Sequence, residues 1–538
     1  MLGLMMNRPL LIIDILKHAV RTSPSQEIVT RLVEGGIHRY TFAEASDRIA
    51  QLANALKEAG VTVGTRVGVM GWNTHRQLEL YYACAGIGAI CHTINPRLGP
   101  ENAAFVINHA EDSVLFFDET FQPLVEGLKP HLKSVDQYYT LAPKPTSVGG
   151  EKVGTYEDFI SGKPTTFEWE DLDENTACGL CYTSGTTGKP KGVLYSHRGM
   201  VLHSLVTSLP TGLGAGDQDC IMPVVPMFHV NAWGVPYSAL LMGTKLVLPG
   251  AGLDGASLHE LIIKEEVTVS LGVPTVWLNL LKHVDDANGD FGKMRFTLVG
   301  GAALSERLIE GFGKYGVKTR QGWGMTEMSP TGTMNFEETG FEELPREEQI
   351  KRLLRQGRAL PFVDMRIVDE EGHDLPHDGE HDGHLQVRGP WILSAYYKQE
   401  QECCTTDGWF DTGDVAVIHP DGRMQITDRA KDVIKSGGEW ISTIDIENVA
   451  LSHPAVVQAA AIGMPHPKWQ ERPVIVVEFG NEAAEKDEIL AFMKERLPKI
   501  SWPDDVLVVD QIPIGATGKV LKTELRKIFS EYKLPTAS

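Results

Sequence analysis

The sequence predicts an α/β protein: a large N-terminal domain of α/β subdomains with a small β-rich module, followed by a small α+β C-terminal domain. Three observations support this prediction. Short apolar segments alternate with helical segments along most of the chain, which is typical of βαβ units and a mostly parallel sheet. From about residue 363 the strands alternate apolar and polar residues instead. After residue 428 a second, shorter run of strands and helices begins.

The N-terminal elements follow from hydrophobic periodicity. Residues 10–60 are expected to be helical, because apolar residues recur at helical spacing and Gly60 ends the pattern. A further helix is expected at residues 77–86. Short apolar runs predict buried strands at residues 65–71, 89–94, 113–117, 245–248, 267–270 and 296–299.

The last third of the chain has a different pattern of apolar and polar residues. Residues 364–368 and 384–388 alternate apolar and polar side chains, as half-exposed strands do, and glycine-rich turns lie between them. After Arg429 a run of strand, helix, strand and helix extends to Lys533. The predicted domains are therefore residues 1–428 and residues 429–538.

Composition excludes several classes of function. The 538 residues include 50 Lys and Arg against 71 Asp and Glu, a net charge of −21, which argues against nucleic acid or anionic membrane as the main partner. No apolar stretch reaches the 18 residues that a membrane span needs. An odd number of cysteines, seven, favours reduced thiols and the cytoplasm.

Two patterns resemble metal sites but have simpler explanations. Cys178 and Cys181 have CxxC spacing, but they lie in an apolar run without a second pair, which favours buried structural thiols. The segment from residue 373 to residue 384 carries four histidines and three aspartates. Its proline and glycines prevent a single helix that would align them, so we expect a solvated hairpin loop. These residues are His373, His377, His381 and His384, with Asp374, Asp378 and Asp382.

The strongest chemical signal is Tyr182-Thr-Ser-Gly-Thr-Thr-Gly-Lys-Pro-Lys-Gly-Val193. Small residues after a strand can turn several backbone N–H groups toward one anion, and the hydroxyl groups and two lysines add further donors and positive charge. The segment is not a Walker A loop, because only two residues separate Gly185 from Gly188 and Pro190 follows Lys189. We therefore expect a phosphate-binding loop of another kind.

This loop resembles that of the adenylate-forming enzymes, which include acyl-CoA synthetases, peptide-synthetase adenylation domains and luciferases. Further motifs match this family in its order, at residues 321–327, 407–414, 427–438 and 515–522, and together they span about residues 10–530. Arg21-Thr-Ser-Pro-Ser and Trp72-Asn-Thr-His-Arg are most similar to the bacterial medium-chain and 3-methylmercaptopropionate CoA ligases. The resemblance implies ATP, CoA and Mg²⁺ as cofactors or substrates.

The resemblance also implies roles for individual residues in nucleotide binding. Lys519 would bridge the α-phosphate and the carboxylate, Asp414 would accept the ribose hydroxyls, and Arg429 would assist it. Thr183 and Glu327 would bind Mg²⁺, a cation that prefers oxygen ligands. Trp323 replaces the tyrosine common in the family, and either ring can stack on adenine. The remaining nucleotide contacts would be Ser184, Gly185, Thr186, Thr187, Gly188, Lys189, Gly301, Ala302, Ala303, Gln321, Gly322, Gly324, Met325 and Thr326.

The other substrate sites are implied in the same way. The acyl pocket would be formed by His229, Trp233, Trp323, Gly301 and Pro330, and its two indoles favour a short acid; packing of Trp233 in the core is the alternative. Lys435, Ser436, Gly437 and Gly438 would approach CoA, and Lys435 would also stabilise the thioester-forming state as a catalytic residue; a plain β-turn is the alternative. Lys431 would be the hinge about which a mobile C-terminal domain rotates, or else a solvated loop lysine.

We expect an acid–CoA ligase that forms an acyl adenylate and pyrophosphate from a carboxylate and ATP, and then acyl-CoA and AMP. The expected acid is 3-methylmercaptopropionate, followed by butyrate-to-octanoate-like acids. One alternative is an adenylation module that loads a carrier-protein thiol in trans; another is a luciferase-like oxygenase, for which the sequence has no feature of its own. We expect no nucleic-acid partner and no membrane insertion. A homodimer is common in the family.

Overall fold

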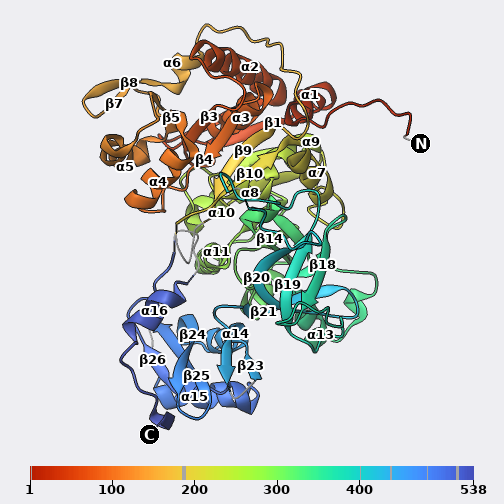
Figure 1. Ribbon diagram of the computed structural model, residues 1–538, viewed down its shortest axis with the longest axis vertical. Coiled ribbons are helices and arrows are strands. Elements are labelled where there is room, and N and C mark those ends of the chain that lie inside the picture. Colours follow the sequence, from red (N-terminus) through yellow and green to blue (C-terminus); the bar gives the residue numbers. More distant parts are fainter. Residues whose placement is uncertain are drawn as a thin grey trace.

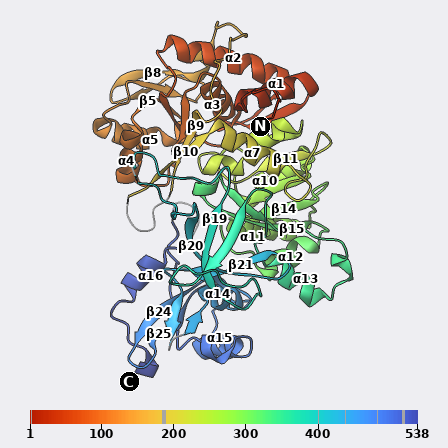
Figure 2. The same ribbon diagram turned by 45° about the vertical axis from the view of Figure 1, so that its right-hand side comes forward.

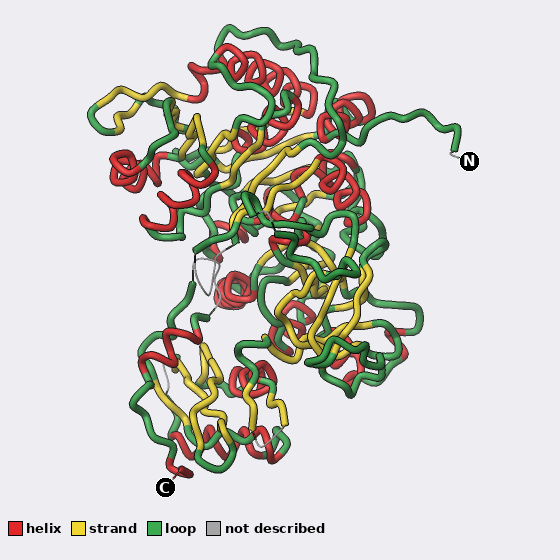
Figure 3. The backbone as a smooth tube through the Cα atoms, viewed as in Figure 1, coloured by secondary structure: helices red, strands yellow, loops and turns green. Residues whose placement is uncertain are grey.

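The computed structural model describes residues 1, 3–183, 189–399, 401–436, 439–480, 483–515 and 520–537. A large N-terminal domain with two mixed sheets lies above a small β-rich C-terminal domain in Figure 1. The tube in Figure 3 shows helices packed against the strands of each part. The predicted fold class is thus confirmed. No helix among the described residues has the length and apolar character needed to cross a membrane.

The larger sheet contains thirteen described strands and changes from parallel to antiparallel along its width. Parallel pairs run from β15 to β1, and antiparallel pairs run from β15 to β18. In spatial order the strands are β18 (Asp364–Val368), β19 (Gly383–Arg388), β20 (Phe410–Ile418), β21 (Arg423–Arg429), β17 (Gly357–Ala359), β16 (Thr331–Met334), β15 (Lys318–Gly324), β14 (Phe296–Val299), β13 (Val269–Gly272), β11 (Cys220–Pro223), β12 (Lys245–Leu248), β1 (Glu27–Arg31) and β2 (Ile37–Thr41).

The β-rich module predicted from residue 363 onward is therefore continuous with this sheet. Its strands join the parallel part through β16, which pairs with β15 and β17. Residues from both parts of the chain consequently share one hydrogen-bonded framework. This continuity places β15 and β20 in the same sheet.

The second sheet is built from strands that lie between Arg66 and Ser196. Its central strands are parallel and buried, and the pair of strands β9 and β10 at one edge is antiparallel. In spatial order the strands are β10 (Gly192–Ser196), β9 (Ala177–Tyr182), β4 (Ile90–Thr93), β3 (Arg66–Met70), β5 (Asp112–Phe117), β6 (Gln137–Thr140), β8 (Glu151–Thr155) and β7 (Thr146–Val148). Buried parallel strands read as short apolar runs, which is why their positions could be predicted.

The expectation of helix throughout residues 10–60 was wrong. Helices α1 (Ile12–Thr22) and α2 (Phe42–Glu58) are separated by the antiparallel strands β1 and β2. The turn between these strands contains Gly35 and Gly36, whose φ angles are 96° and 85°. Strand β1 also pairs with β12, which belongs to a distant part of the sequence. Local periodicity does not reveal a pairing of this kind.

The remaining helices of the N-terminal domain cover the two sheets (Figures 1 and 2). They are α3 (His75–Gly86), α4 (Pro100–Ala110), α5 (Gln122–Leu128), α6 (Tyr156–Ile160), α7 (His197–Thr207), α8 (Val230–Trp233), α9 (Val235–Leu241), α10 (Gly255–Lys264), α11 (Pro274–Asp286), α12 (Glu306–Gly313) and α13 (Arg346–Leu353). Turn α8 is left-handed: its four residues have φ between 47° and 57°.

The C-terminal domain has its own sheet and its own core. Its strands are β23 (Glu439–Ile441), β22 (Ile434–Ser436), β25 (Gln470–Phe479), β24 (Val456–His466) and β26 (Val506–Val508), and its helices are α14 (Thr443–Leu451), α15 (Lys486–Lys494) and α16 (Lys522–Ile528). Two hydrophobic clusters there contain only residues from Ile434 onward. The boundary at residue 428 stays a prediction; strand β21 ends at Arg429, and the next sheet begins at Ile434.

Candidate active site

Two predicted nucleotide segments meet at the carboxyl ends of neighbouring parallel strands. Strand β14 leads into Gly301, Ala302 and Ala303, and strand β15 ends in the segment that includes Gln321; Val299 pairs with Gln321 in the register of the two strands. Ligands of α/β sheets commonly bind at such ends. Gly301 has a φ of 79°, a conformation that favours glycine. The sheet therefore brings together two segments that are not adjacent in sequence.

The side chains of Trp323 and Asp414 are hydrogen-bonded to each other. The indole Nε1 of Trp323 donates to Asp414 Oδ2 at 3.0 Å. Arg429 lies opposite Asp414 in the pairing of β20 with β21, and its Nε is 3.8 Å from Asp414 Oδ1. Trp323 is 8% exposed, so its ring is held in the core of the sheet. The tryptophan thus fixes one oxygen of the predicted ribose-binding carboxylate.

Glu327 lies in the short 3₁₀ turn η3 (Thr326–Met328), close after β15. It is 7% exposed, and its Oε1 accepts a hydrogen bond of 2.8 Å from the hydroxyl group of Tyr396. The backbone carbonyl of Thr326 accepts from the Tyr195 hydroxyl at 2.8 Å. Burial, together with the nearby charge of Glu327, raises the pKa of Tyr396, so its hydroxyl keeps its proton and donates. This carboxylate is therefore anchored at one oxygen.

The ends of the predicted phosphate loop are joined by two hydrogen bonds. The Thr183 amide donates to the Lys191 carbonyl at 2.9 Å, and the Lys191 amide donates to Thr183 Oγ1 at 3.2 Å. The ammonium groups of Lys189 and Lys191 lie 5.1 and 4.6 Å from the ring centroids of Phe105 and Tyr396. The tip of the loop, Ser184, Gly185, Thr186, Thr187 and Gly188, lies outside the described residues.

The predicted acyl segment reaches the same region. Turn α8 follows His229 and ends at Trp233, whose indole lies so close to Gly300 that a Cβ there would be 2.8 Å from Cη2 of the ring. The Gly322 carbonyl is 3.2 Å from the same point. Pro330, another predicted wall residue, is buried, and its carbonyl accepts from the Met325 amide at 3.0 Å. The indole of Trp233 thus borders the predicted adenine slot.

Gly324 makes the tightest of these backbone approaches. A Cβ on this glycine would lie 2.0 Å from the Pro330 carbonyl oxygen, so a side chain cannot be accommodated without a backbone shift. Gly322 has more room, with a nearest neighbour at 3.4 Å. The backbone can therefore fold back on itself here because residue 324 has no side chain.

The predicted CoA and hinge residues lie at the junction of the two domains. Lys435, on β22, is 51% exposed and pairs with Glu370 at 3.1 Å; its ammonium group lies 5.6 Å from the ring centroid of Trp440. Ser436 is buried beside it. Lys431 lies in the turn between β21 and β22, while Gly437, Gly438 and Lys519 lie outside the described residues.

An open acidic cleft of about 320 Å³ adjoins this ion pair. It separates the connection between β18 and β19 from Trp440 of the C-terminal domain. Its lining consists of Val368, Asp369, Glu370, Glu371, Leu375, His381, Asp382 and Trp440. The C-terminal domain thus rests on an acidic surface of the N-terminal domain.

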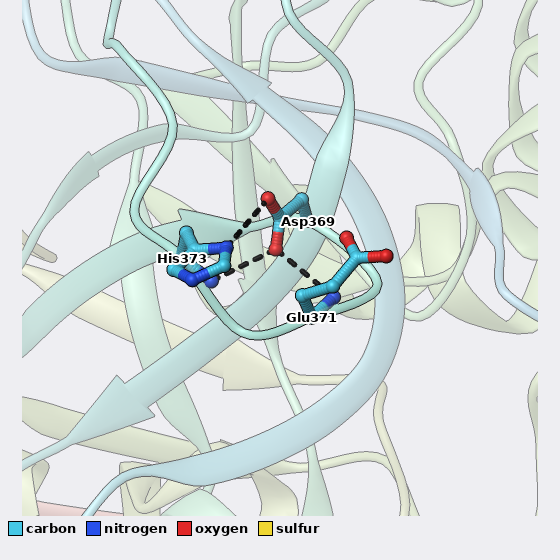
Figure 4. A group of neighbouring side chains, drawn as sticks. All are labelled: Asp369, Glu371 and His373. Carbon is cyan, nitrogen blue, oxygen red and sulfur yellow. Dashed lines mark hydrogen bonds and ion pairs between the residues drawn. The ribbon is translucent and has the colours of Figure 1, made fainter.

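The histidine-rich segment forms the solvated turns that were expected. In Figure 4, Asp369 accepts from the backbone amides of Glu371 and His373, at 3.0 and 2.8 Å, and from the His373 ring at 3.2 Å. Oxygen and nitrogen atoms of these three residues lie within 4.8 Å of one another, but the carboxylate is already used to cap the turn. Cys178 and Cys181 are both buried, as predicted, and their thiols contact Tyr195 and Thr93.

Sequence reasoning missed Tyr396 and the function of the indole N–H of Trp323. Tyr396 belongs to an irregular segment between β19 and β20 that lies outside the predicted nucleotide, acyl and CoA segments. Its only signal is a pair of adjacent tyrosines in a loop, which is uninformative without the fold. The bond from Trp323 to Asp414 depends on side-chain rotamers on strands 91 residues apart.

Comparisons with known proteins identify the family of the chain. The family model "AMP-binding enzyme" matches residues 16–397, and "AMP-binding enzyme C-terminal domain" matches residues 445–519. The chain is 46% identical over 535 residues to a 3-methylmercaptopropionyl-CoA ligase of Ruegeria lacuscaerulensis, covering 99% of each chain. It is 43% identical to a medium-chain-fatty-acid–CoA ligase of Ectopseudomonas oleovorans, covering 100% of this chain and 99% of that one.

Solved structures show the same fold. An anthranilate CoA ligase in complex with anthranoyl-AMP has a TM-score of 0.86 at 24% identity, covering 98% of each chain. ATP-bound MatB from Rhodopseudomonas palustris has a TM-score of 0.82 at 25% identity, covering 98% of this chain and all of that one.

The fold and the matched models together define a two-domain ligase that uses a nucleotide to activate a carboxylic acid. The chain belongs to the family of AMP-binding, adenylate-forming enzymes. Within this family it is an AMP-forming acyl-CoA ligase, an acid–thiol ligase for which ATP and CoA are the implied substrates.

Proposed function

We propose that the enzyme joins CoA to a short, apolar acid, with 3-methylmercaptopropionate as the first candidate and butyrate-to-octanoate-like acids as the second. The names of two 3-methylmercaptopropionyl-CoA ligases at 46% identity support the first candidate, and the name of a medium-chain-fatty-acid–CoA ligase at 43% supports the second, whereas another relative at 43% is a long-chain-fatty-acid–CoA ligase. The observation that carries the proposal is the contact of Trp233 with Gly300, because a bulky indole next to the nucleotide segments limits the depth left for an acyl chain. The proposed compartment is the cytoplasm.

We assign nucleotide binding to the segments that the strand ends bring together. The segments at Gly301 and Gln321 would hold adenine, and Asp414 with Arg429 would hold the ribose. The phosphate loop and Lys519 would contact the phosphates. Thr183 and Glu327 suit Mg²⁺, since a hydroxyl group and a buried carboxylate are hard oxygen donors. When bound, Mg²⁺ would offset the negative charge on the phosphate oxygens.

The residues would act in two chemical steps. First, a carboxylate oxygen attacks the α-phosphorus of ATP, the bond to the β-phosphate breaks, and pyrophosphate leaves. Cationic donors such as Lys519 would stabilise the charge that develops on the phosphate oxygens. Second, the CoA thiol, having lost its proton, attacks the acyl carbon, and AMP leaves. His229 would sit between the carboxylate and the CoA path.

The second step requires another arrangement of the C-terminal domain. Lys435 pairs with Glu370 in the pose described above, so its ammonium group is directed to the acidic surface of the N-terminal domain. We propose that rotation about Lys431 exchanges Lys519 for the segment from Lys435 to Gly438 at the site. Domain rotation of this kind is carried by a few residues in a connecting turn.

A panel of acids tests the proposed reaction. Linear acids from acetate to decanoate and a series of thioether acids are incubated with ATP and Mg²⁺, and AMP, pyrophosphate and thioester are measured with and without CoA. We expect AMP and acyl-CoA with CoA present, and the best turnover with 3-methylmercaptopropionate. Release of ADP and phosphate would refute the adenylate mechanism. Adenylate formation without any thioester on free CoA would favour a carrier-protein thiol as acceptor.

Substitution of Trp233 tests the size limit. Trp233→Ala should open the pocket. The kcat/KM for longer acids should then rise relative to that for short acids by a factor equivalent to about 1–3 kcal/mol, the range of a hydrophobic pocket change. The ratio of kcat/KM for octanoate and 3-methylmercaptopropionate measures this effect. An unchanged ratio together with a lower Tm would show that Trp233 is a core residue only.

A further inference from the structure

A segment that the sequence did not single out crosses the nucleotide site. Residues 391–397, here the crossing segment, connect β19 to the region before β20. The Leu393 amide donates to the Glu327 carbonyl at 2.9 Å, and the Tyr397 amide donates to the Gly192 carbonyl at 2.8 Å. The Ser329 hydroxyl donates to the Trp391 carbonyl at 2.9 Å. The crossing segment thus joins turn η3 to the start of β10, just beyond the phosphate loop.

Tyr396 occupies the middle of this bridge and touches charges of both signs. Its hydroxyl group donates to Glu327 Oε1 at 2.8 Å, and the Lys191 ammonium group lies 4.6 Å from its ring centroid. The ring face attracts a cation, while the hydroxyl edge binds the anion. One side chain therefore holds the lysine and the carboxylate at separate places.

We propose that Tyr396 is a positioning residue that orients Glu327 and keeps Lys191 from neutralising it. This inference rests on the proposed function, in which Glu327 is a Mg²⁺ ligand and Lys191 lies beside the phosphates. Outer partners that hold one oxygen of a carboxylate commonly orient the ligand for its metal. Without the aromatic spacer, the ammonium group could pair with the carboxylate, and both charges would be lost to the substrate.

The first test removes only the hydroxyl group. Tyr396→Phe keeps the ring under Lys191, and Tyr397→Phe is the matched control, because Tyr397 lies on the same segment and packs its ring against His109. Mn²⁺ binding is measured by electron paramagnetic resonance with α,β-methylene-ATP, and acid-dependent pyrophosphate release is measured as a function of Mg²⁺. We expect Tyr396→Phe to weaken Mn²⁺ binding about tenfold, the lower end of the effect of an outer partner of a metal ligand.

The same variant should lower kcat for adenylate formation while the KM for the acid stays within twofold. Tyr397→Phe should match the unmodified enzyme in every measurement. Equal Mn²⁺ affinity and equal kcat in Tyr396→Phe and the unmodified enzyme would overturn the proposal. A melting temperature within a few degrees of the unmodified enzyme shows that a loss does not come from unfolding.

The second test removes the spacer. Tyr396→Leu should raise the KM for ATP about fivefold beyond Tyr396→Phe, because the cation–π contact with Lys191 is also lost. Adding Lys191→Met should then have a much smaller effect in Tyr396→Leu than in the unmodified enzyme. Fully additive effects of the two substitutions would contradict the spacer role. Absence of acid-dependent pyrophosphate release from the unmodified enzyme is a separate outcome and would refute the proposed function itself.

Discussion

The carboxylates of the site and the lysine of the C-terminal domain are held in opposite ways. Glu327 is 7% exposed, the Asp414 side chain is 13% exposed, and each accepts a hydrogen bond from an aromatic side chain. Lys435 is 51% exposed and its partner Glu370 is 62% exposed. The first arrangement fixes charges in place, whereas the second can be broken and remade.

The difference has a physical basis. Tyrosine and tryptophan have few rotatable bonds and lose little freedom when they are buried, so their donors hold an acceptor firmly. A solvent-exposed ion pair contributes at most about 1 kcal/mol. In the proposed mechanism, the carboxylates that stay in place are thus buried, and the lysine that moves lies on the surface. Four substitutions test whether the buried and the exposed groups differ in this way.

The largest effect is expected for Lys519. Its ammonium group should matter only while charge develops on the phosphates, so Lys519→Ala should slow adenylate formation on the order of 10²–10³-fold. Thioester formation from preformed acyl adenylate should be spared, and rapid-quench assays of both half-reactions measure this. Equal losses in both would refute the division of labour between Lys519 and Lys435.

A smaller loss, confined to thioester formation, is expected when the proposed hinge residue Lys431 is replaced. Proline fixes φ near −65°, so Lys431→Pro should keep adenylate formation within about tenfold and lose most thioester formation, if that φ suits the adenylating pose. Circular dichroism checks the fold. Retained CoA turnover in a folded variant would contradict both the hinge and the two-pose mechanism.

Removal of the indole N–H of Trp323 tests the buried hydrogen bond that holds Asp414. Trp323→Phe keeps an aromatic ring but loses the hydrogen bond to Asp414, and a bond to a charged group contributes roughly 1.5–3 kcal/mol. We expect the KM for ATP to rise about tenfold. With 2′-deoxy-ATP the increase should be smaller, because Asp414 then has one ribose hydroxyl fewer to bind. The same increase for both nucleotides would separate Trp323 from ribose binding.

The smallest effect is expected for the exposed ion pair between Glu370 and Lys435. Glu370→Gln removes the ion pair with Lys435 and should raise the rate of thioester formation no more than about threefold at low salt, consistent with a surface pair. The gain should disappear at high ionic strength, where exposed charges are screened. Glu371→Gln, on the same turn, is the control for charge alone. A large, salt-independent change would place Lys435 among the fixed groups.

Six of the parallel strands could be predicted, because buried strands leave short apolar runs. Strand β15 leaves no such run, so its pairing with β14 was not predicted. The hairpin of β1 and β2 could not be predicted either, because β1 is held by β12, which comes from a distant part of the sequence. Tyr396 and the N–H of Trp323 act through rotamers across distant strands, so no local pattern indicates them. The residues outside the described ranges, Lys519 among them, rest on the motifs alone.

Turn α8 reverses the usual stereochemical preferences of a polypeptide. Four consecutive L-residues, Val230 to Trp233, have the backbone hand that suits D-amino acids, at a cost of roughly 1–2 kcal/mol each. In this one turn glycine, the poorest non-proline residue of a right-handed helix, is the best for the backbone, and β-branched Val230 is among the worst. Backbone stereochemistry alone would therefore favour D-alanine over L-alanine at position 232, the reverse of the preference in a right-handed helix.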